Sequence, residues 1–141
     1  MNHIESICRK YNIINYTIKD DGVVDVNGSV YFYDKGLYKL PLKFGKVTGN
    51  FSCAFNNLSS LSGCPKWVGG DFFCHGNKLK ELDGPDFVDG DFIIDKSIVN
   101  LLDERYEINN DYEYPRVTNY NFVNKLIKRG NNINSILKNN I

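Results

Sequence analysis

Apolar residues recur along the middle of this chain with a period of about 21 residues. Four valines set the register, Val26, Val47, Val68 and Val88, at spacings of 21, 21 and 20 residues. From one valine to the next the pattern is V-x-G-x-F-x-C-x-x-N-x-L-x-x-L-x-G-x-P. A period of this size is typical of solenoid repeats, in which no unit can bury its apolar face alone and the units must stack.

A short strand is predicted directly after the glycine of each unit, because apolar and polar residues alternate there, as in a strand with one face turned inward. In the two most regular units the inward positions are Phe51, Cys53, Phe72 and Cys74. An asparagine follows where the chain must turn, and its side chain can bond to backbone groups that the turn leaves unpaired. We therefore expect an α/β repeat fold, a short right-handed solenoid with about four parallel strands over residues 23–102.

Both open ends of such a stack need covering elements. At the N-terminus, four apolar residues lie at helical spacing: Ile4, Ile7, Cys8 and Tyr11. Apolar and polar residues alternate on both sides of the Asp-Gly pair at residues 21–22, which is typical of a β-hairpin. Residues 1–22 are therefore predicted to form a helix and strand cap.

The C-terminal part, residues 103–141, is predicted to be an acidic loop followed by a helical cap. Residues 103–116 show no clean period, so we expect a loop or an irregular crossover there. An apolar helical stripe follows: Phe122, Val123, Leu126 and Ile127. Gly130 is the expected stop of this helix, and a second short helix is expected around residues 133–138. A chain of 141 residues accommodates these three parts in one domain.

The central units resemble the leucine-rich repeat, whose signature is L-x-L-x-x-N-x-L. FSCAFNNL (residues 51–58) and FFCHGNKL (residues 72–79) match it, with Phe and Cys in place of the first two leucines. The longer pattern L-x-G-C-P-x-x-V-G-G-x-F-x-C is similar to short repeat proteins of bacteriophages and environmental bacteria. This resemblance implies a leucine-rich-repeat-like solenoid, encoded by a phage and acting in the cytoplasm of the host cell.

Charge argues against a general nucleic-acid binder, because 17 basic residues balance 17 acidic ones. No apolar run approaches a membrane span, and the N-terminus lacks the pattern of a signal peptide, so we expect a cytoplasmic protein with reduced cysteines. The charge is unevenly distributed. Residues 81–113 contain eleven acidic residues against two basic ones, whereas residues 114–141 contain five basic residues and no acidic one. This pattern indicates either a solvated acidic edge or electrostatic steering toward a partner or a second copy.

No pattern of catalytic or metal-binding residues emerges. Cys53 and Cys74 occupy the same inward position of neighbouring strands and are expected to fill the core. His75 follows Cys74 directly, so the two side chains should face opposite sides of the strand and cannot share a proton. We expect no enzymatic activity, no metal and no cofactor.

The outward strand positions form two columns: Tyr31, Ser52, Phe73 and Ile93, and Tyr33, Ala54, His75 and Asp95. A solvated face should be polar, and these columns are partly aromatic. One interpretation is that a cap or the chain's own C-terminal segment covers them. The other is a binding surface, since clustered apolar groups mark contact surfaces. Under the second interpretation the candidate binding residues are Tyr31, Tyr33, Phe73, His75, Ile93, Asp91 and Asp95.

These observations favour a non-catalytic protein-binding repeat module that inhibits or adapts a host protein, such as a defence component. Two alternatives stay open. One is a structural virion or assembly component that self-associates into a homo-oligomer through its ends. The other is an inhibitor that mimics nucleic acid with the acidic residues of 81–113. No membrane partner and no direct contact with nucleic acid are expected.

Overall fold

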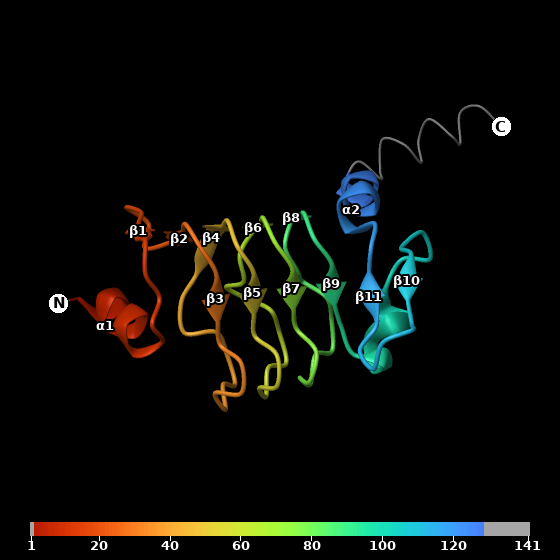
Figure 1. Ribbon diagram of the computed structural model, residues 1–141, viewed down its shortest axis with the longest axis horizontal. Coiled ribbons are helices and arrows are strands. Elements are labelled where there is room, and N and C mark those ends of the chain that lie inside the picture. Colours follow the sequence, from red (N-terminus) through yellow and green to blue (C-terminus); the bar gives the residue numbers. More distant parts are fainter. Residues whose placement is uncertain (1, 129–141) are drawn as a thin grey trace.

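Each repeat unit forms one coil of a parallel-strand β-solenoid and contributes two short strands, one before and one after its glycine (Figure 1). The computed structural model describes residues 2–128 of the chain. Strands in equivalent positions of successive coils pair in parallel, which builds two sheets whose inward side chains belong to one buried cluster. The predicted solenoid is confirmed.

The first sheet, called the valine sheet below, contains the repeated valines. Its parallel strands are β2 (Val24–Val26), β4 (Phe44–Val47), β6 (Trp67–Val68) and β8 (Phe87–Val88). An additional strand, β1 (Tyr16–Ile18), pairs antiparallel with β2. The sequence predicted the β1–β2 hairpin but not the rest of this sheet, because β6 and β8 show no alternation of apolar and polar residues.

The second sheet, called the phenylalanine sheet below, follows the repeated glycines as predicted. Its parallel strands are β3 (Val30–Tyr31), β5 (Phe51–Ser52), β7 (Phe72–Phe73) and β9 (Phe92–Ile93). The inward rings pack in a row along the solenoid: Phe51 and Phe72 are stacked with ring centroids 5.4 Å apart, and Phe72 and Phe92 meet edge-to-face with ring centroids 5.1 Å apart. Because these rings are almost completely buried, they supply much of the apolar area that stabilises the stack.

Asparagine side chains join neighbouring coils at the turn that follows the phenylalanine sheet. The Asn56 side-chain oxygen accepts from the N–H groups of Lys35 and Leu37 in the preceding coil, each at 3.0 Å. Its amide nitrogen donates to the carbonyl of Phe32 at 2.7 Å. Asn77 makes the equivalent bonds one coil later, accepting from Leu58 N–H. Each asparagine thereby pairs backbone groups that the bend would otherwise leave unsatisfied.

A second series of polar side chains joins the coils just before the phenylalanine sheet. The backbone N–H of each residue donates to the side chain one coil earlier: Asn50 to Ser29, Asp71 to Asn50, and Asp91 to Asp71. The glycine before each of these residues lies against the preceding coil. A Cβ atom on Gly70 would be 3.0 Å from backbone atoms of Gly49, so the close approach of the coils requires glycine here.

At the N-terminal end, the predicted helix and hairpin are present as α1 (His3–Lys10) and the β1–β2 pair (Figure 1). The side chain of Asn2 accepts a hydrogen bond from Glu5 N–H at 2.7 Å, which satisfies one of the free donors at the start of α1. Cys8 is the fully buried residue of this helix, and the ring of Tyr11 packs edge-on against that of Phe32 at 5.0 Å. These contacts fix α1 against the first coil.

At the C-terminal end, residues 103–116 are mostly irregular as predicted, but the prediction missed two short strands. After a 3-10 helix, η1 (Lys96–Leu101), the chain forms β10 (Ile108–Asn109) and β11 (Arg116–Val117). β11 pairs antiparallel with β9, and β10 pairs antiparallel with β11, so the chain itself extends the phenylalanine sheet. Strands of two residues leave no periodic signal in the sequence.

The predicted C-terminal helix is α2 (Tyr120–Lys128). Its Asn121 side chain accepts from Val88 N–H at 2.6 Å, and its Asn124 side chain donates to the carbonyl of Asp86 at 2.7 Å. The helix therefore pairs backbone groups along the last strand of the valine sheet, which has no further coil beside it. The expected stop at Gly130 and the expected helix at residues 133–138 lie outside the described residues.

Replacing Asn56 with alanine should lower the free energy of unfolding by about 2–4 kcal/mol, because several backbone groups of two coils lose their partner in a buried place. The adjacent Asn57→Ala variant is the matched control, since the side-chain amide of Asn57 makes no hydrogen bond within residues 2–128. Urea unfolding of both variants measures the difference. Equal stability of the two variants would show that the asparagine bonds between coils contribute nothing.

Candidate binding surface on the phenylalanine sheet

Aromatic side chains gather on the outer face of the phenylalanine sheet and on the bend that follows it. Tyr31 and Tyr33 are each 53% exposed, whereas Phe55, Phe73 and Tyr114 are partly buried. These five side chains are called the aromatic surface below. Phe55 lies at its centre, with its ring centroid 5.3 Å from that of Tyr33 and 5.6 Å from that of Tyr114. The predicted residues Tyr31, Tyr33 and Phe73 are thus on the surface of the protein.

Phe55 holds a backbone conformation that is uncommon for a bulky residue. Its φ angle is +54°, in the left-handed region, and the equivalent residues of neighbouring coils are Asp34 (φ +52°) and Gly76 (φ +72°). A Cβ atom on Gly76 would be 2.6 Å from the Phe55 ring, so the glycine makes room for this ring. Aspartate and glycine tolerate positive φ, whereas phenylalanine is disfavoured there. The surroundings must therefore hold Phe55 in place.

Sequence reasoning missed Phe55 and Tyr114. The repeat column of Phe55 also contains Asp34 and Gly76 and therefore shows no shared apolar character. The sequence did contain one signal: Phe55 is a large aromatic residue at a repeat position where Asp34 and Gly76 are residues typical of a tight turn. Tyr114 comes from the segment that was expected to be irregular, and only the pairing of β11 with β9 carries it onto this face.

His75 is not the accessible residue that was expected. It is 9% exposed, because the Tyr114 ring lies 4.3 Å from its ring and the Phe55 ring lies 5.0 Å from it. Its Nδ1 atom is buried without a hydrogen-bond partner. Burial lowers the pKa of this imidazole and the nearby Arg116 lowers it further, while Asp95 and Glu113 oppose the shift. The neutral imidazole is therefore favoured in the folded protein.

Ile93 is also covered, which corrects its assignment as an exposed contact residue. It is 3% exposed, because β11 pairs with β9 and the chain before β11 runs alongside, where Ile94 N–H donates to the carbonyl of Pro115 at 3.0 Å. The interpretation that the chain's own C-terminal segment covers the outward face thus holds for the half nearest β9. The half nearest β3 stays open.

The two predicted acidic site residues bind other parts of the same chain. Asp91 forms an ion pair of 3.3 Å with Arg116 of β11. Asp95 accepts hydrogen bonds from the N–H groups of Gly76 and Asn77, at 2.8 and 3.3 Å. The Asp95 side chain therefore gives backbone N–H groups in the turn of the preceding coil their hydrogen-bond partners, as the Asn56 side chain does earlier in the stack. Asp91 links the last parallel strand to β11.

The cysteines are unsuited to nucleophilic chemistry. Burial raises the pKa of the Cys53 and Cys74 thiols well above the ordinary value, and it raises that of Cys64 to about 12. The thiols of Cys53 and Cys74 lie 3.6 and 3.5 Å from the carbonyls of Phe73 and Ile93. Within residues 2–128, no three His, Cys, Asp or Glu side chains are grouped so that they could hold a metal ion.

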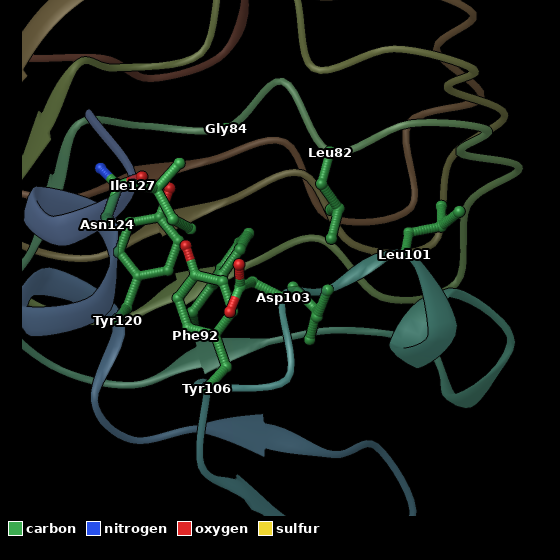
Figure 2. Close-up of a pocket in the computed structure, with 10 residues that line it drawn as sticks. Leu82, Gly84, Phe92, Leu101, Asp103, Tyr106, Tyr120, Asn124 and Ile127 are labelled. Carbon is green, nitrogen blue, oxygen red and sulfur yellow. The ribbon is translucent and has the colours of Figure 1, made fainter. Parts of the chain in front are cut away.

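A cavity of about 420 Å³ lies at the C-terminal end of the solenoid, between η1, β9 and α2 (Figure 2). Aromatic rings form one side of it: the ring centroids of Tyr106 and Tyr120 are 5.8 Å apart, and those of Phe92 and Tyr120 are 4.8 Å apart. The Tyr120 hydroxyl donates to the carbonyl of Pro85. The cavity thus combines an apolar wall with hydroxyl groups, and it contains no paired nucleophile and base among the described residues.

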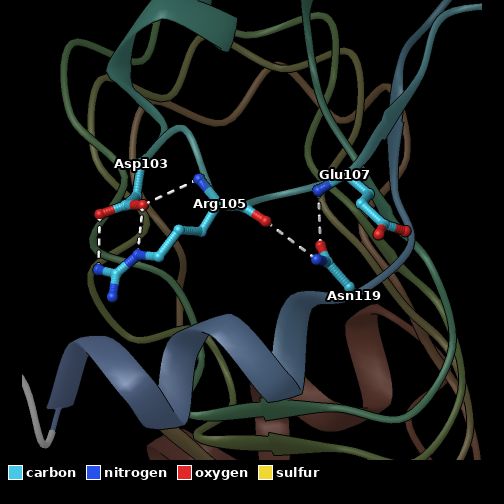
Figure 3. A network of polar contacts seen from close by, with 4 residues as sticks. All are labelled: Asp103, Arg105, Glu107 and Asn119. Carbon is cyan, nitrogen blue, oxygen red and sulfur yellow. Dashed lines mark hydrogen bonds and ion pairs between the residues drawn. The ribbon is translucent and has the colours of Figure 1, made fainter.

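The one carboxylate of this cavity is already engaged (Figure 3). Asp103 accepts from Arg105 Nε at 2.7 Å and from its Nη2 at 2.8 Å, and this bidentate pair lowers the pKa of Asp103 to about 2. Beside it, the Asn119 side chain joins two backbone groups, accepting from Glu107 N–H and donating to the carbonyl of Arg105. These hydrogen bonds stabilise the chain that leads into β10, so we assign them a structural role.

Comparison with protein-family models, with curated proteins and with solved structures finds no match. None of the helices within residues 2–128 has the length and apolar character needed to cross a membrane. The function has to be inferred from the side chains that the fold brings to its surface.

The lowered pKa of His75 predicts a pH dependence of stability. An unfolded histidine titrates near 6.5 and takes up its proton before the folded one does, so stability is complete above that pH and falls as the pH decreases through it. The slope from one proton is at most about 1.4 kcal/mol per pH unit. Urea unfolding between pH 7.5 and about 5 measures it.

The His75→Phe variant should lose this part of the pH dependence, because it keeps an aromatic ring between Phe55 and Tyr114 and removes the titrating group. The control is His3→Gln, which replaces the exposed histidine of α1 and leaves His75 packed between Phe55 and Tyr114. A slope that persists in His75→Phe and disappears in His3→Gln would contradict this assignment.

Proposed function

We propose that this chain is a non-catalytic protein-binding module and that the open half of the aromatic surface is its contact site. The observation that carries this proposal is the exposure of Tyr31 and Tyr33 beside the partly buried Phe55 and Phe73. Tyrosine and phenylalanine supply large contact area with few rotatable bonds, and clusters of such exposed side chains are typical of protein interfaces. Tyr31 and Phe73 lie on paired strands, and Tyr33 and Phe55 lie just after such strands, so the sheet positions these rings before binding, which lowers the entropic cost of binding.

The solenoid is proposed to belong to the leucine-rich-repeat-like class. The bonds of Asn56 and Asn77 across the turns support this, because they place the signature asparagine where a solenoid of this class needs it. The additional parallel strands of the valine sheet are an elaboration of that pattern. The helix and hairpin at one end and α2 at the other are proposed to act as caps that protect the stack from aggregation.

The resemblance to short repeat proteins of bacteriophages supports a partner in the host cell. The protein would then act in the host cytoplasm, as an inhibitor or adaptor of a host protein such as a defence component. The acidic region contributes to this role through long-range electrostatics. Its exposed carboxylates beside β10, Glu104, Glu107, Asp111 and Glu113, favour approach of a basic partner surface toward that end.

Phe73→Ala should weaken binding of the partner by about 2 kcal/mol or more, because this partly buried ring lies on β7, in the middle of the phenylalanine sheet, and aromatic anchors dominate interface energies. Its effect on the free energy of unfolding should stay within about 1 kcal/mol, as for a surface position. The neighbouring Phe72→Ala is the matched comparison, since Phe72 is completely buried and its loss should cost about 3–5 kcal/mol. Capture from a bacterial lysate on the immobilised protein identifies the partner, and titration calorimetry then measures both variants.

Tyr33→Ala extends the test to the exposed edge of the same surface. Retention of full affinity in both Phe73→Ala and Tyr33→Ala, with both variants folded, would refute this face as the contact site. The exposed carboxylates between residues 104 and 113 would then be the surface to examine. Unfolding of Phe73→Ala would instead mean that this ring supports the core.

A further inference from the structure

The solenoid has four terminal parallel strands, and three of them are paired by other parts of the chain. β1 covers β2, the asparagines of α2 cover β8, and β11 covers β9. The fourth terminal strand is β3, at the N-terminal edge of the phenylalanine sheet (Figure 1). No strand of the described chain pairs with its outer edge.

The outer edge of β3 presents free hydrogen-bonding groups. The N–H groups of Val30, Phe32 and Asp34 donate to carbonyls of the β5 segment at 2.9, 2.7 and 3.1 Å. Because successive residues of a strand point their backbone groups to opposite sides, those of Tyr31 and Tyr33 face away from β5. Outside the β3–β5 pairing, none of the hydrogen bonds within residues 2–128 uses the N–H of Tyr31 or Tyr33. An unpaired edge of this kind is a template for another strand.

A groove of about 380 Å³ runs along this edge. Lys10, Tyr11 and Ile13 line one side, and Tyr31, Tyr33 and Lys35 line the other. The wall opposite β3 is therefore the end of α1 and the chain that leaves it. A single extended segment can lie between these walls beside β3, whereas the folded end of a second copy would first have to displace them.

The charge of the groove indicates the chemistry of its ligand. Lys10 and Lys35 line it, and none of its lining residues within residues 2–128 is acidic, although the exposed Asp34 lies between Tyr33 and Lys35 in the chain. A neighbouring groove of about 710 Å³ shares Lys10 and adds Lys39 and Lys43, again without a carboxylate among its lining residues. A negatively charged segment is complementary to this end of the solenoid.

We propose that β3 receives an extended acidic segment of a partner protein, which adds to the phenylalanine sheet as a further strand. Tyr31 and Tyr33 then act twice: their backbone groups bond to the added strand, and their rings flank it on the outer face. This mode of recognition takes affinity from main-chain hydrogen bonds and selectivity from alternate side chains and charge. It rests on the proposed protein-binding function but uses the strand edge, which the Phe73 side chain does not touch.

Synthetic peptides test this proposal with the intact protein. The probe is a fluorescein-labelled nonapeptide of alternating Glu and Val, whose valines match the inward side of the pleat and whose glutamates match the outer one. The matched probe has Lys in place of every Glu. Fluorescence anisotropy should show saturable binding of the Glu-Val peptide and binding about tenfold weaker or more for the Lys-Val peptide.

Two substitutions at position 31 separate the contribution of the backbone N–H to peptide binding from that of the side chain. Tyr31→Pro removes the free N–H at a place where an edge strand tolerates proline, whereas Tyr31→Ala keeps it. The proline variant should bind the Glu-Val peptide about tenfold more weakly than the alanine variant. Thermal unfolding verifies that both are folded, and Tyr33→Pro replaces Tyr31→Pro if the latter does not fold. Reversing both groove charges, Lys10→Glu with Lys35→Glu, should abolish binding of the acidic peptide.

Asn57→Ala changes neither the groove nor the aromatic surface and should leave peptide affinity unchanged. Loss of peptide binding in Tyr31→Pro while a captured partner still binds through the aromatic surface would separate the two proposals. Absence of saturable binding of the Glu-Val peptide, equal affinity for the two peptides, or equal affinity of the proline and alanine variants would each overturn strand addition at β3. Self-association that is lost in Tyr31→Pro would also overturn it, because a second copy would then be the occupant.

Discussion

The whole structure depends on the requirement that each coil satisfies the backbone of its neighbour. Strands of two to four residues are too short to form stable pairs alone, and they persist here because every coil repeats the same register. Between the strands, Asn56, Asn77 and Asp71 pair backbone groups at the bends with side-chain atoms. The apolar columns then pack because the coils are held at a fixed spacing. Nothing in the repeat itself limits the number of coils in such a solenoid. The sequence and the structure therefore differ from the repeat pattern at the two ends of the stack.

The interior could be predicted from the sequence because it is periodic. The register of Phe51, Phe72 and Phe92 followed from the spacing alone, and so did the position of Asn56 at a turn. Apart from the β1–β2 hairpin, the valine sheet escaped prediction because the residues before each repeated glycine show no alternation of apolar and polar side chains. β10 and β11 escaped prediction as well, and they changed the candidate site most. The segment before β11 brings the Tyr114 ring against His75, and β11 lies beside Ile93, so both are buried where the repeat pattern alone places them on the outer face.

The acidic candidates illustrate the same difficulty. Asp95 was assigned to a binding surface as an outward position and Asp91 as its acidic neighbour. In the structure the Asp95 side chain accepts from the turn of the preceding coil, and the Asp91 side chain pairs with Arg116. Asp91 extends the series that begins at Ser29, and Asp95 satisfies the turn at Gly76. Phe55 shows the converse, since its column predicts a turn residue and the structure places a ring there. Position within a repeat determines the geometry, whereas the contacts at the ends of the stack determine which side chains stay free for a partner.

The two ends of the solenoid differ in their unpaired backbone groups and in the charge of their side chains. The end that carries β9 is closed by the chain's own strands and is rich in carboxylates, whereas the end that carries β3 keeps an open strand edge between lysines. Amide hydrogen exchange measured by NMR tests this asymmetry most directly. The N–H groups of Phe51, Cys53 and Phe72, which bond to the next coil, should exchange slowly, and those of Tyr31 and Tyr33 should exchange rapidly in the free protein. Slow exchange of Tyr31 and Tyr33 in the monomer, comparable to that of Phe51, would contradict an open edge at β3.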